Sequence, residues 1–360
     1  MGELKPDTAT EIRKGEAFDF DQLQSYLDTF FGNKNSEMEV LQFPSGYSNL
    51  TYLVRYNDRD YVIRRPPFGA KIKSGHDMSR EFNILSGLRG HFSKAPKPIL
   101  FCEDESVIGA NFYMMEKVSG IILRGNMPRE DIPKPEQIQA IVVDFVDTLN
   151  SLHRMDYKAA GLENFGKPDG YVRRQVEGWI FRYEKSKTHD HHGINTTMKW
   201  LNDNYPQKHK VSLIHNDFKY DNLVLSPDEN LFIKAVLDWE MATIGDPLMD
   251  LGTTLGYWIH ESDPDFIREN QLNLSSVKGN PKRGELVQMY AAKSGEDLDG
   301  ILFYFVFGLF KIAVIVQQIF YRYQKGFTQD PRFKDLDKIV ELYGIMAQQA
   351  ISKKRIDDLF

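Results

Sequence analysis

The feature that most constrains the fold is an abrupt change in hydrophobic patterning near residue 118 of the 360-residue chain. Before it, short runs rich in β-branched and aromatic residues alternate with turn-forming residues, as is typical of antiparallel strands. Beyond it, apolar residues recur at helical spacing over long segments. The pattern predicts a strand-rich N-terminal lobe over residues 1–118 and a mainly helical C-terminal lobe over residues 119–360.

The N-terminal lobe is predicted to begin with an amphipathic helix, because Phe20, Leu23, Leu27 and Phe30 fall on one helical face. Five strands and a second helix should follow. We expect the strands within 38–43, 49–56, 61–65, 98–103 and 111–118, and the helix within 74–90.

The C-terminal lobe is predicted to contain seven main helices and very few strands. The helical patterns cover roughly 134–155, 168–187, 195–205, 247–260, 283–294, 297–323 and 334–352, and only NLVLS (222–226) and IKAVLDW (233–239) look like strands. The apolar segment 301–323 is long enough to cross a membrane, but its central Lys311 would be costly in lipid. We therefore expect a buried helix there.

Charge and cysteine content exclude several classes of protein. A formal charge of −6 without a basic run argues against a nucleic-acid partner. The single cysteine, Cys102, excludes an internal disulfide and fits a reducing compartment. The first twenty residues lack the apolar core of a signal peptide. We expect a cytoplasmic protein that has neither nucleic acid nor membrane as a partner.

Two polar clusters beside predicted strands carry the candidate chemistry. The first, in LIHNDFKYDNLVLS (213–226), contains Asp217 and Asn222, and the second, in AVLDWE (235–240), contains Asp238. A carboxylate that orients a hydroxyl, together with oxygen ligands for Mg²⁺, is the set that phosphoryl transfer requires. The alternative is a polar turn followed by a helix cap.

These motifs resemble the aminoglycoside phosphotransferase/choline kinase family, which is related to protein kinases. With YVIRRPP, SREFNILSGL and LDWEMATIGDPLMDLG, the chain most resembles the branch whose kinase-like domains are fused to some acyl-CoA dehydrogenases. The resemblance spans roughly residues 40–320. It implies an α+β, protein-kinase-like fold of two lobes, with ATP and Mg²⁺ as cofactors and a small-molecule hydroxyl as phosphate acceptor.

The resemblance also implies roles for residues of the C-terminal lobe. Asp217 matches the catalytic base, Asn222 and Asp238 match the Mg²⁺ ligands, and His215 matches a structural residue of the loop. Lys219 stands where serine/threonine kinases also have lysine, and it could neutralise charge on the transferred phosphoryl group. A solvated surface lysine is the alternative. Tyr220 and Asp221 are assigned to loop structure.

In the N-terminal lobe, the resemblance places a phosphate-covering loop at PSGYSNLTY (44–52). One glycine and small polar residues let backbone approach phosphate closely, although an ordinary hairpin would have the same composition. The nucleotide-binding residues implied here are Ser45, Gly46, Ser48 and Asn49.

The basic residue of the third strand departs from the kinase pattern. Arg64 takes the place of the usual lysine, and Glu81 of the following helix matches its ion-pair partner. Arginine remains charged, but its planar fork is less adaptable than an ammonium group. Arg65 should point to the other face of the sheet and be structural.

The segment YMMEKVSG (113–120) matches the connection whose backbone meets adenine. Met114, Met115 and Val118 would line an apolar slot, and Glu116 belongs to the same nucleotide-binding segment. Taken alone, the run is simply a buried strand.

The segment after Asp238 is short, since a helix cap at Asp246–Pro247 follows closely. This leaves no room for a long activation loop and favours a small-molecule kinase. A nucleotide-binding pseudokinase is the alternative function, because Arg64 replaces lysine and the phosphate loop is poor in glycine. The basic and acidic residues of 168–205 lean towards an anionic or acyl-CoA-like acceptor, although a solvated helix face explains them equally well.

Two further groups have bland and functional interpretations. His189–Asp190–His191–His192 suggests a metal site, but without other ligands we expect a flexible surface loop. Tyr257, Trp258 and His260 lie on a helix that could face the acceptor, with packing as the default.

Overall fold

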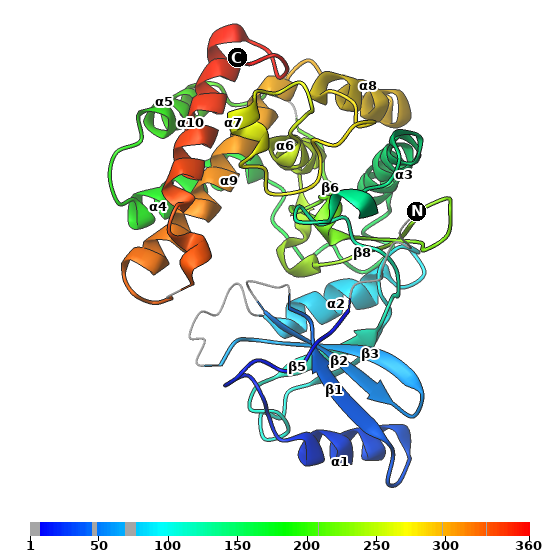
Figure 1. Ribbon diagram of the computed structural model, residues 1–360. Coiled ribbons are helices and arrows are strands. Elements are labelled where there is room, and N and C mark those ends of the chain that lie inside the picture. Colours follow the sequence, from blue (N-terminus) through cyan, green and yellow to red (C-terminus); the bar gives the residue numbers. More distant parts are fainter. Residues whose placement is uncertain (1–7, 45–48, 69–76, 208, 297, 329) are drawn as a thin grey trace.

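The computed structural model describes residues 8–360, apart from 45–48, 69–76, 208, 297 and 329, and it has two lobes (Figure 1). A twisted antiparallel sheet and two helices form the smaller lobe, and most of the remaining chain is helical. The predicted α+β class, with a strand-rich lobe followed by a mainly helical lobe, is confirmed. The predicted domain boundary at 118/119 stays a prediction.

The N-terminal sheet has the strand order β1-β2-β3-β5-β4. Its strands are β1 (Met38–Gln42), β2 (Leu50–Tyr56), β3 (Arg59–Arg65), β4 (Pro98–Cys102) and β5 (Phe112–Glu116). Neighbouring strands all pair antiparallel. Side chains alternate across β3, so Ile63 packs into the N-terminal core whereas Val62 and Arg64 line the cleft between the lobes.

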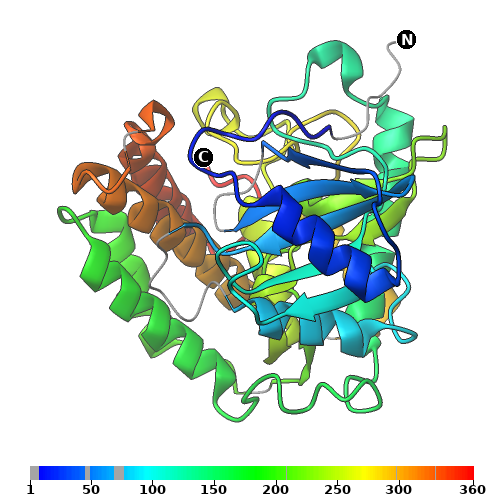
Figure 2. The same ribbon diagram turned by 90° about the horizontal axis from the view of Figure 1, so that it is seen from below.

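Two helices cover the two faces of this sheet. Helix α1 (Phe20–Phe31) lies on the outer face, and α2 (Met78–Leu88) lies between the sheet and the C-terminal lobe (Figures 1 and 2). Leu23 and Leu27 are fully buried as predicted, but Phe20 and Phe30 are 38% and 48% exposed, so the predicted apolar face is only half correct.

The C-terminal lobe is built around α9. Its helices are α3 (Pro135–Arg154), α4 (Tyr171–Ser186), α5 (His192–Asp203), α6 (Pro247–Tyr257), α7 (Asp265–Arg268), α8 (Arg283–Ser294), α9 (Ile301–Gln324) and α10 (Leu336–Lys353). Four further segments form single 3₁₀ turns: 129–131, 220–222, 239–241 and 331–333. Helices α4, α5, α9 and α10 gather on one side of the lobe (Figures 1 and 2).

Two small sheets frame the polar clusters. Strand β6 (Ser212–Ile214) pairs with β9 (Thr243–Gly245), and β7 (Leu223–Leu225) pairs with β8 (Ile233–Val236). The prediction of only two strands in this lobe was wrong, because β6 and β9 are three residues each, too short to show alternation. Their pairing joins segments thirty residues apart, which local patterning does not reveal.

By length and composition, helix α9 could cross a membrane. However, 78% of its most apolar 18-residue stretch is buried in the protein. The prediction of a buried helix is confirmed. Its backbone touches α6, since a Cβ atom built on Gly308 would lie 2.0 Å from the carbonyl oxygen of Gly252. Glycine is required there for the two helices to approach.

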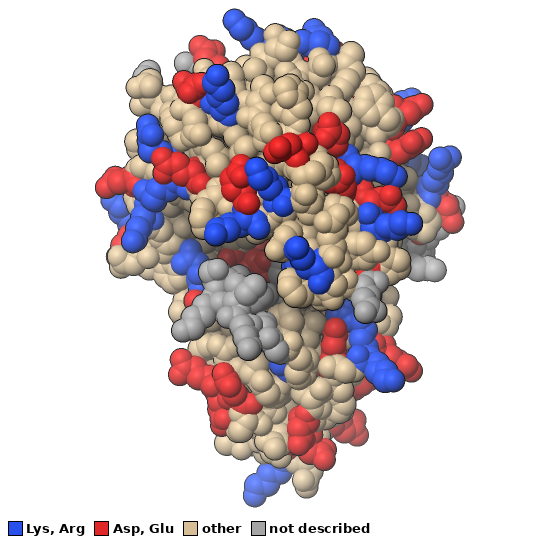
Figure 3. Space-filling view, turned by 90° about the vertical axis from the view of Figure 1, so that its left-hand side faces the viewer, with Lys and Arg blue, Asp and Glu red and all other residues tan. Residues whose placement is uncertain are grey.

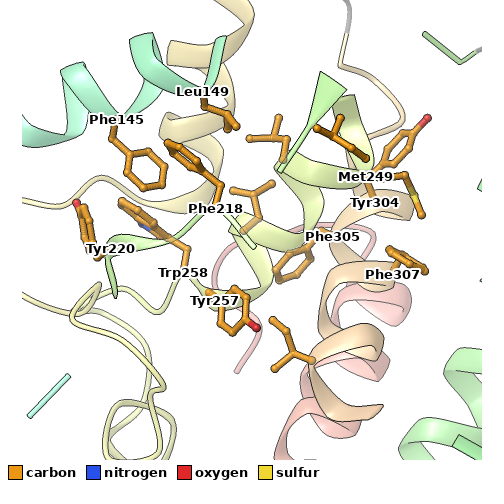
Figure 4. Packing of buried hydrophobic residues seen from close by; sticks show 14 of the residues in the cluster. Phe145, Leu149, Phe218, Tyr220, Met249, Tyr257, Trp258, Tyr304, Phe305 and Phe307 are labelled. Carbon is orange, nitrogen blue, oxygen red and sulfur yellow. The ribbon is translucent and has the colours of Figure 1, made fainter. Parts of the chain in front are cut away.

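An aromatic cluster supports the segment between β6 and β7 (Figure 4). The rings of Phe218 and Tyr220 lie 4.7 and 5.4 Å from the ring of Phe145 on α3, and Tyr220 also packs on Trp258. These contacts fix the backbone on both sides of Lys219, whose side chain pairs with Asp217.

Candidate active site

The loop over residues 215–222, here the catalytic loop, is anchored by one buried carboxylate of α6. Asp250 accepts hydrogen bonds from the backbone N–H groups of His215 and Asn216 at 2.6 and 2.8 Å. Burial opposes ionisation of Asp250, but the hydrogen bond and charge of His153 outweigh it and lower the pKa of Asp250. Asn216 has a positive φ of 68°, and the anchored loop holds it in this left-handed conformation.

His215 links the catalytic loop to the second polar cluster. Its side chain is fully buried, and its Nε2 lies 2.9 Å from the carbonyl oxygen of Leu237. The backbone N–H of Leu237 donates in turn to the carbonyl of Asn222 at 2.8 Å. The geometry agrees with the structural role predicted for His215.

Asp217 lies at the centre of a compact polar group. Lys219 Nζ is 2.9 Å from its Oδ2, and Asn222 Nδ2 donates to the same oxygen at 2.9 Å. Burial disfavours the charged form of Lys219, but the Asp217 carboxylate outweighs burial and raises the lysine pKa. Lys219 is thus a paired, largely buried cation, and the alternative of a solvated surface lysine is wrong.

Asp238 follows β8 and meets Arg64 across the cleft. Both terminal nitrogens of Arg64 donate to Asp238 Oδ1 at 3.1 Å, and Nη1 also donates to Glu81 at 2.5 Å. Glu240 lies 3.3 Å from Nη2. Burial opposes ionisation of Asp238, but Arg64 outweighs it and lowers the pKa of Asp238. The predicted Arg64–Glu81 pair is present.

The donor set suits Mg²⁺. Asn222 directs its amide nitrogen at Asp217, through bonds of 2.8 and 2.9 Å to the backbone and side-chain oxygens, which leaves the amide oxygen as a ligand. Asp238 contributes a carboxylate on the same cleft wall. Carboxylate and amide oxygens are the ligands this ion prefers.

An apolar slot lies further along the cleft. Among its lining residues are Val62, Met115, Glu116, Val118, Ile122, Val224 and Leu237. Met115, Glu116 and Val118 are thus at the predicted place. The prediction for Met114 was wrong, because its side chain points to the other face of β5 and packs into the N-terminal core.

The predicted phosphate loop is only partly visible. Ser45, Gly46 and Ser48 lie outside the described residues, so their assignment as nucleotide-binding residues stays a prediction. Asn49 begins the described part, and its Nδ2 donates to Glu240 at 2.7 Å. This bond joins the two lobes at the mouth of the cleft.

Several cleft residues were not predicted from the sequence. Asp221 was assigned to loop structure, but it lines the cleft, and burial raises its pKa to about 6. Glu240 contacts both Arg64 and Asn49. The adjacent LDWE motif was the only signal for Glu240, and the sequence offered none for the exposure of Asp221 to the cleft.

A basic and aromatic group extends from Asp217 along the helices. The Lys219 ammonium lies 4.6 Å from the ring centre of Tyr257, and buried Lys311 of α9 donates to the Asn216 carbonyl at 2.6 Å. Lys311 lies 5.8 Å from the Trp179 ring, over which Arg182 stacks at 4.6 Å. Tyr257 therefore lies beside the catalytic loop.

The sequence profile of the phosphotransferase enzyme family matches residues 39–284, more than half of the chain. The chain belongs to this phosphotransferase family. The predicted family and enzyme class, a phosphotransferase with a small-molecule alcohol acceptor, are confirmed at this level. The assigned roles of single residues stay predictions.

The phosphotransferase is similar to several known proteins. It is 32% identical over 346 residues to mouse acyl-CoA dehydrogenase family member 10, a match that covers 95% of this chain but only 32% of the relative. A candidate aminoglycoside phosphotransferase from Ralstonia eutropha has a crystal structure with 30% identity and a TM-score of 0.78, covering 94% of this chain and 99% of that one. Choline kinase from Cryptosporidium parvum shares the fold, with a TM-score of 0.62 and 13% identity over 89% of this chain and 92% of its own.

Proposed function

We propose that this phosphotransferase transfers the γ-phosphate of ATP, bound with Mg²⁺, to a hydroxyl of a small anionic molecule such as a hydroxyacyl compound. The observation that supports the chemistry most directly is that Asn222, Asp238 and Arg64 line one cleft, with Asp217 hydrogen-bonded to Asn222 at 2.9 Å. These groups supply a proton acceptor, oxygen ligands for a metal and a cation for phosphate.

In the proposed reaction, Asn222 and Asp238 would hold Mg²⁺, and this ion would supply positive charge that offsets the charge of the phosphates. Asp217 accepts the proton of the acceptor hydroxyl while the oxygen of that hydroxyl forms a bond to the γ-phosphorus. The bond from that phosphorus to the β–γ bridging oxygen breaks, and ADP leaves. Arg64 and Lys219 offset the negative charge of the transferred group.

The acceptor assignment rests on the group of cations beside Asp217. Lys219, Lys311 and Arg182 extend away from the catalytic loop together with Trp179 and Tyr257. On the corresponding face, Lys and Arg side chains stand among Asp and Glu side chains on the C-terminal lobe, and Asp or Glu atoms show inside the recess between the lobes (Figure 3). Lys311 is buried and Lys219 is paired with Asp217, so Arg182 is the exposed cation of this group. Its guanidinium would favour carboxylate or phosphate groups over the cationic amines of choline or an aminoglycoside. The name of the mouse relative refers to an acyl-CoA dehydrogenase, which also favours an acyl compound as the acceptor.

Phosphoryl transfer tests the chemistry. With γ-labelled ATP and a panel of hydroxyacyl compounds, we expect labelled product from the wild type and a loss of at least about 100-fold in Asp217→Asn, which removes the base but keeps the shape. Asp203→Asn, on an exposed helix end, is the matched control and should retain activity. Equal turnover in Asp217→Asn would remove Asp217 from the role of base.

The acceptor class has its own test. Arg182→Ala should raise KM for an anionic acceptor without changing the KM for ATP, whereas Lys185→Ala on the same helix should change neither. A panel in which choline or an aminoglycoside is the better acceptor would contradict the anionic assignment while leaving the phosphotransferase chemistry intact.

The pseudokinase alternative was suggested by Arg64 and the phosphate loop, and the family match does not favour it. Nucleotide binding with no phosphoryl transfer across the acceptor panel would restore it. We also propose a cytoplasmic location, supported by the single, buried and unpaired Cys102.

A further inference from the structure

The histidines of the α4–α5 connection have an acidic partner that the sequence did not reveal. Asp337, in the first turn of α10, lies beside His189 and His191, 146 residues after the latter. The expectation that these histidines lack another ligand was wrong. We infer that His189, His191 and Asp337 form a site for one divalent transition-metal ion of the Zn²⁺ type.

The spacing of the three ligand atoms fits such an ion. His191 Nε2 is 3.1 Å from Asp337 Oδ1, and His189 Nε2 is 3.6 Å from Oδ2. All three candidate ligand atoms lie within 4.8 Å of one another. Ligands at about 2.0–2.1 Å from a tetrahedral Zn²⁺ lie about 3.3–3.4 Å apart. Small side-chain adjustments would therefore complete the coordination.

The outer contacts orient both imidazoles. The Nδ1 atom of His191 lies 3.0 Å from the hydroxyl of buried Tyr183, and Nδ1 of His189 lies 3.3 Å from the hydroxyl of Thr188. Each ring can thus keep its proton on Nδ1 and turn Nε2 towards Asp337. Hydrogen bonds from the second ring nitrogen are the usual support of metal-bound histidine. His191 is 1% exposed, so its orientation is fixed by packing.

The ligand chemistry selects the kind of ion. Two imidazoles and one carboxylate suit Zn²⁺ and related transition metals, whereas Mg²⁺ and Ca²⁺ prefer an all-oxygen set. His189 and Asp337 have side chains 53% and 32% exposed, so the metal can enter from solvent and water can fill the fourth position.

The metal would join the α4–α5 connection to α10, two parts of the wall formed by helices α4, α5, α9 and α10. The end of α4 and the connection are tied to α9, because Gln317 donates to the Ser186 carbonyl at 2.8 Å and to the Thr188 hydroxyl at 3.4 Å. Helix α5 touches α10 at Gly193, where a Cβ would lie 2.6 Å from Gly344. A metal bridge from the α4–α5 connection to α10 would therefore stabilise this wall without entering the nucleotide cleft.

Calorimetry with Zn²⁺ alone tests the site, on an Asp238→Ala background so that metal in the nucleotide cleft is not counted. We expect one Zn²⁺ per chain, and Co²⁺ should give the absorption bands of tetrahedral coordination. His189→Ala and Asp337→Ala should each weaken Zn²⁺ binding at least tenfold. Tyr183→Phe, which removes only the outer hydrogen bond, should weaken it about tenfold.

His192→Ala is the matched control, since His192 is an exposed histidine on the same segment outside the cluster. It should bind Zn²⁺ like its parent, and Zn²⁺ should raise Tm in both but not in His189→Ala. The inference is overturned if the parent binds no Zn²⁺, or if His189→Ala and Asp337→Ala retain its affinity. Circular dichroism on each variant separates lost ligands from lost fold.

Discussion

Arg64 is the cation that pairs with several acidic side chains of the cleft. Its side chain is only 9% exposed and contacts three carboxylates, of which Glu81 is 2% exposed and bonds at 2.5 Å. A carboxylate buried this deeply depends on its cation. The departure from lysine thus extends the pairing, because one guanidinium contacts Glu81, Asp238 and Glu240 together.

Removing that cation should cost stability. We expect Arg64→Met to lower the free energy of unfolding by about 3–5 kcal/mol, since Glu81 is left buried and unpaired. Arg64→Lys should cost less, because it keeps the charge but reaches fewer partners. Adding Glu81→Gln to Arg64→Met should recover part of the loss. Urea unfolding measures all three variants. An unchanged free energy of unfolding in Arg64→Met would show that the Arg64–Glu81 pair contributes little to stability.

Asp221 should make stability depend on pH. Burial raises its pKa from 3.8 to about 6 in the folded protein, so between these values the folded state binds more protons than the unfolded state. Stability attributable to Asp221 therefore falls as pH rises from about 4 to 6. Without nucleotide, Asp221→Asn should exceed the wild type by about 1–3 kcal/mol above pH 6 and match it near pH 4. Parallel profiles of unfolding free energy against pH would contradict this.

The site residues that the sequence predicted belong to local motifs, whereas those it missed are brought to the site by packing between distant segments. Asp217, Asn222 and Asp238 belong to local motifs whose spacing carries their chemistry. Lys311 donates to Asn216, 95 residues away, and Asp337 meets His191 only because α5 packs on α10. Contacts that depend on helix packing leave no local pattern.

Among the elements, α6 and α9 pack closely together in the C-terminal lobe. Gly252 and Gly308 face each other, and α6 also carries Asp250, the anchor of the catalytic loop. Separation of the two helices would therefore displace the catalytic loop as well as the core.

Substitution at this contact should reveal the coupling. Gly308→Ala places a methyl group 2.0 Å from a backbone oxygen, so we expect a loss of about 1–3 kcal/mol and a lower kcat. Gly300→Ala at the start of α9 is the control, since its nearest contact is 3.9 Å away, and it should cost less than about 1 kcal/mol. Chemical denaturation and steady-state kinetics measure both, and equal effects would refute the close-contact explanation.

Long elements were predictable, whereas of the short strands in the C-terminal lobe β7 and β8 were predicted and β6 and β9 were not. Helix α9 and the hairpins of the N-terminal sheet show their period over many residues, so their type and approximate bounds were correct. Strands β6 and β9 exist through pairing with each other and through burial, and nothing local distinguishes either from a loop. These two strands nevertheless position the catalytic loop, which follows β6 directly.

In the whole molecule, the two lobes meet through charged and polar contacts around the proposed nucleotide site. Arg64 contacts Asp238 from the N-terminal side, Asn49 contacts Glu240, and Arg80 donates to the Ala242 carbonyl at 2.9 Å. A nucleotide bound with Mg²⁺ would add a further connection between the same lobes, and so should stabilise the molecule as a unit.

That stabilisation can be measured as a shift in Tm. At an ATP concentration of about 100 times Kd, binding adds about 2.7 kcal/mol. For a chain of this length, unfolding in one cooperative step, this corresponds to a rise of about 3–4 °C. The rise should require Mg²⁺ and disappear with EDTA or in Asp238→Ala, because that variant lacks a proposed metal ligand. Asp203→Asn should keep it. A rise in wild type that survives EDTA would place the nucleotide in the cleft without the metal. If Tm rises in none of these proteins and calorimetry also detects no ATP binding, ATP is not the phosphate donor bound in the cleft.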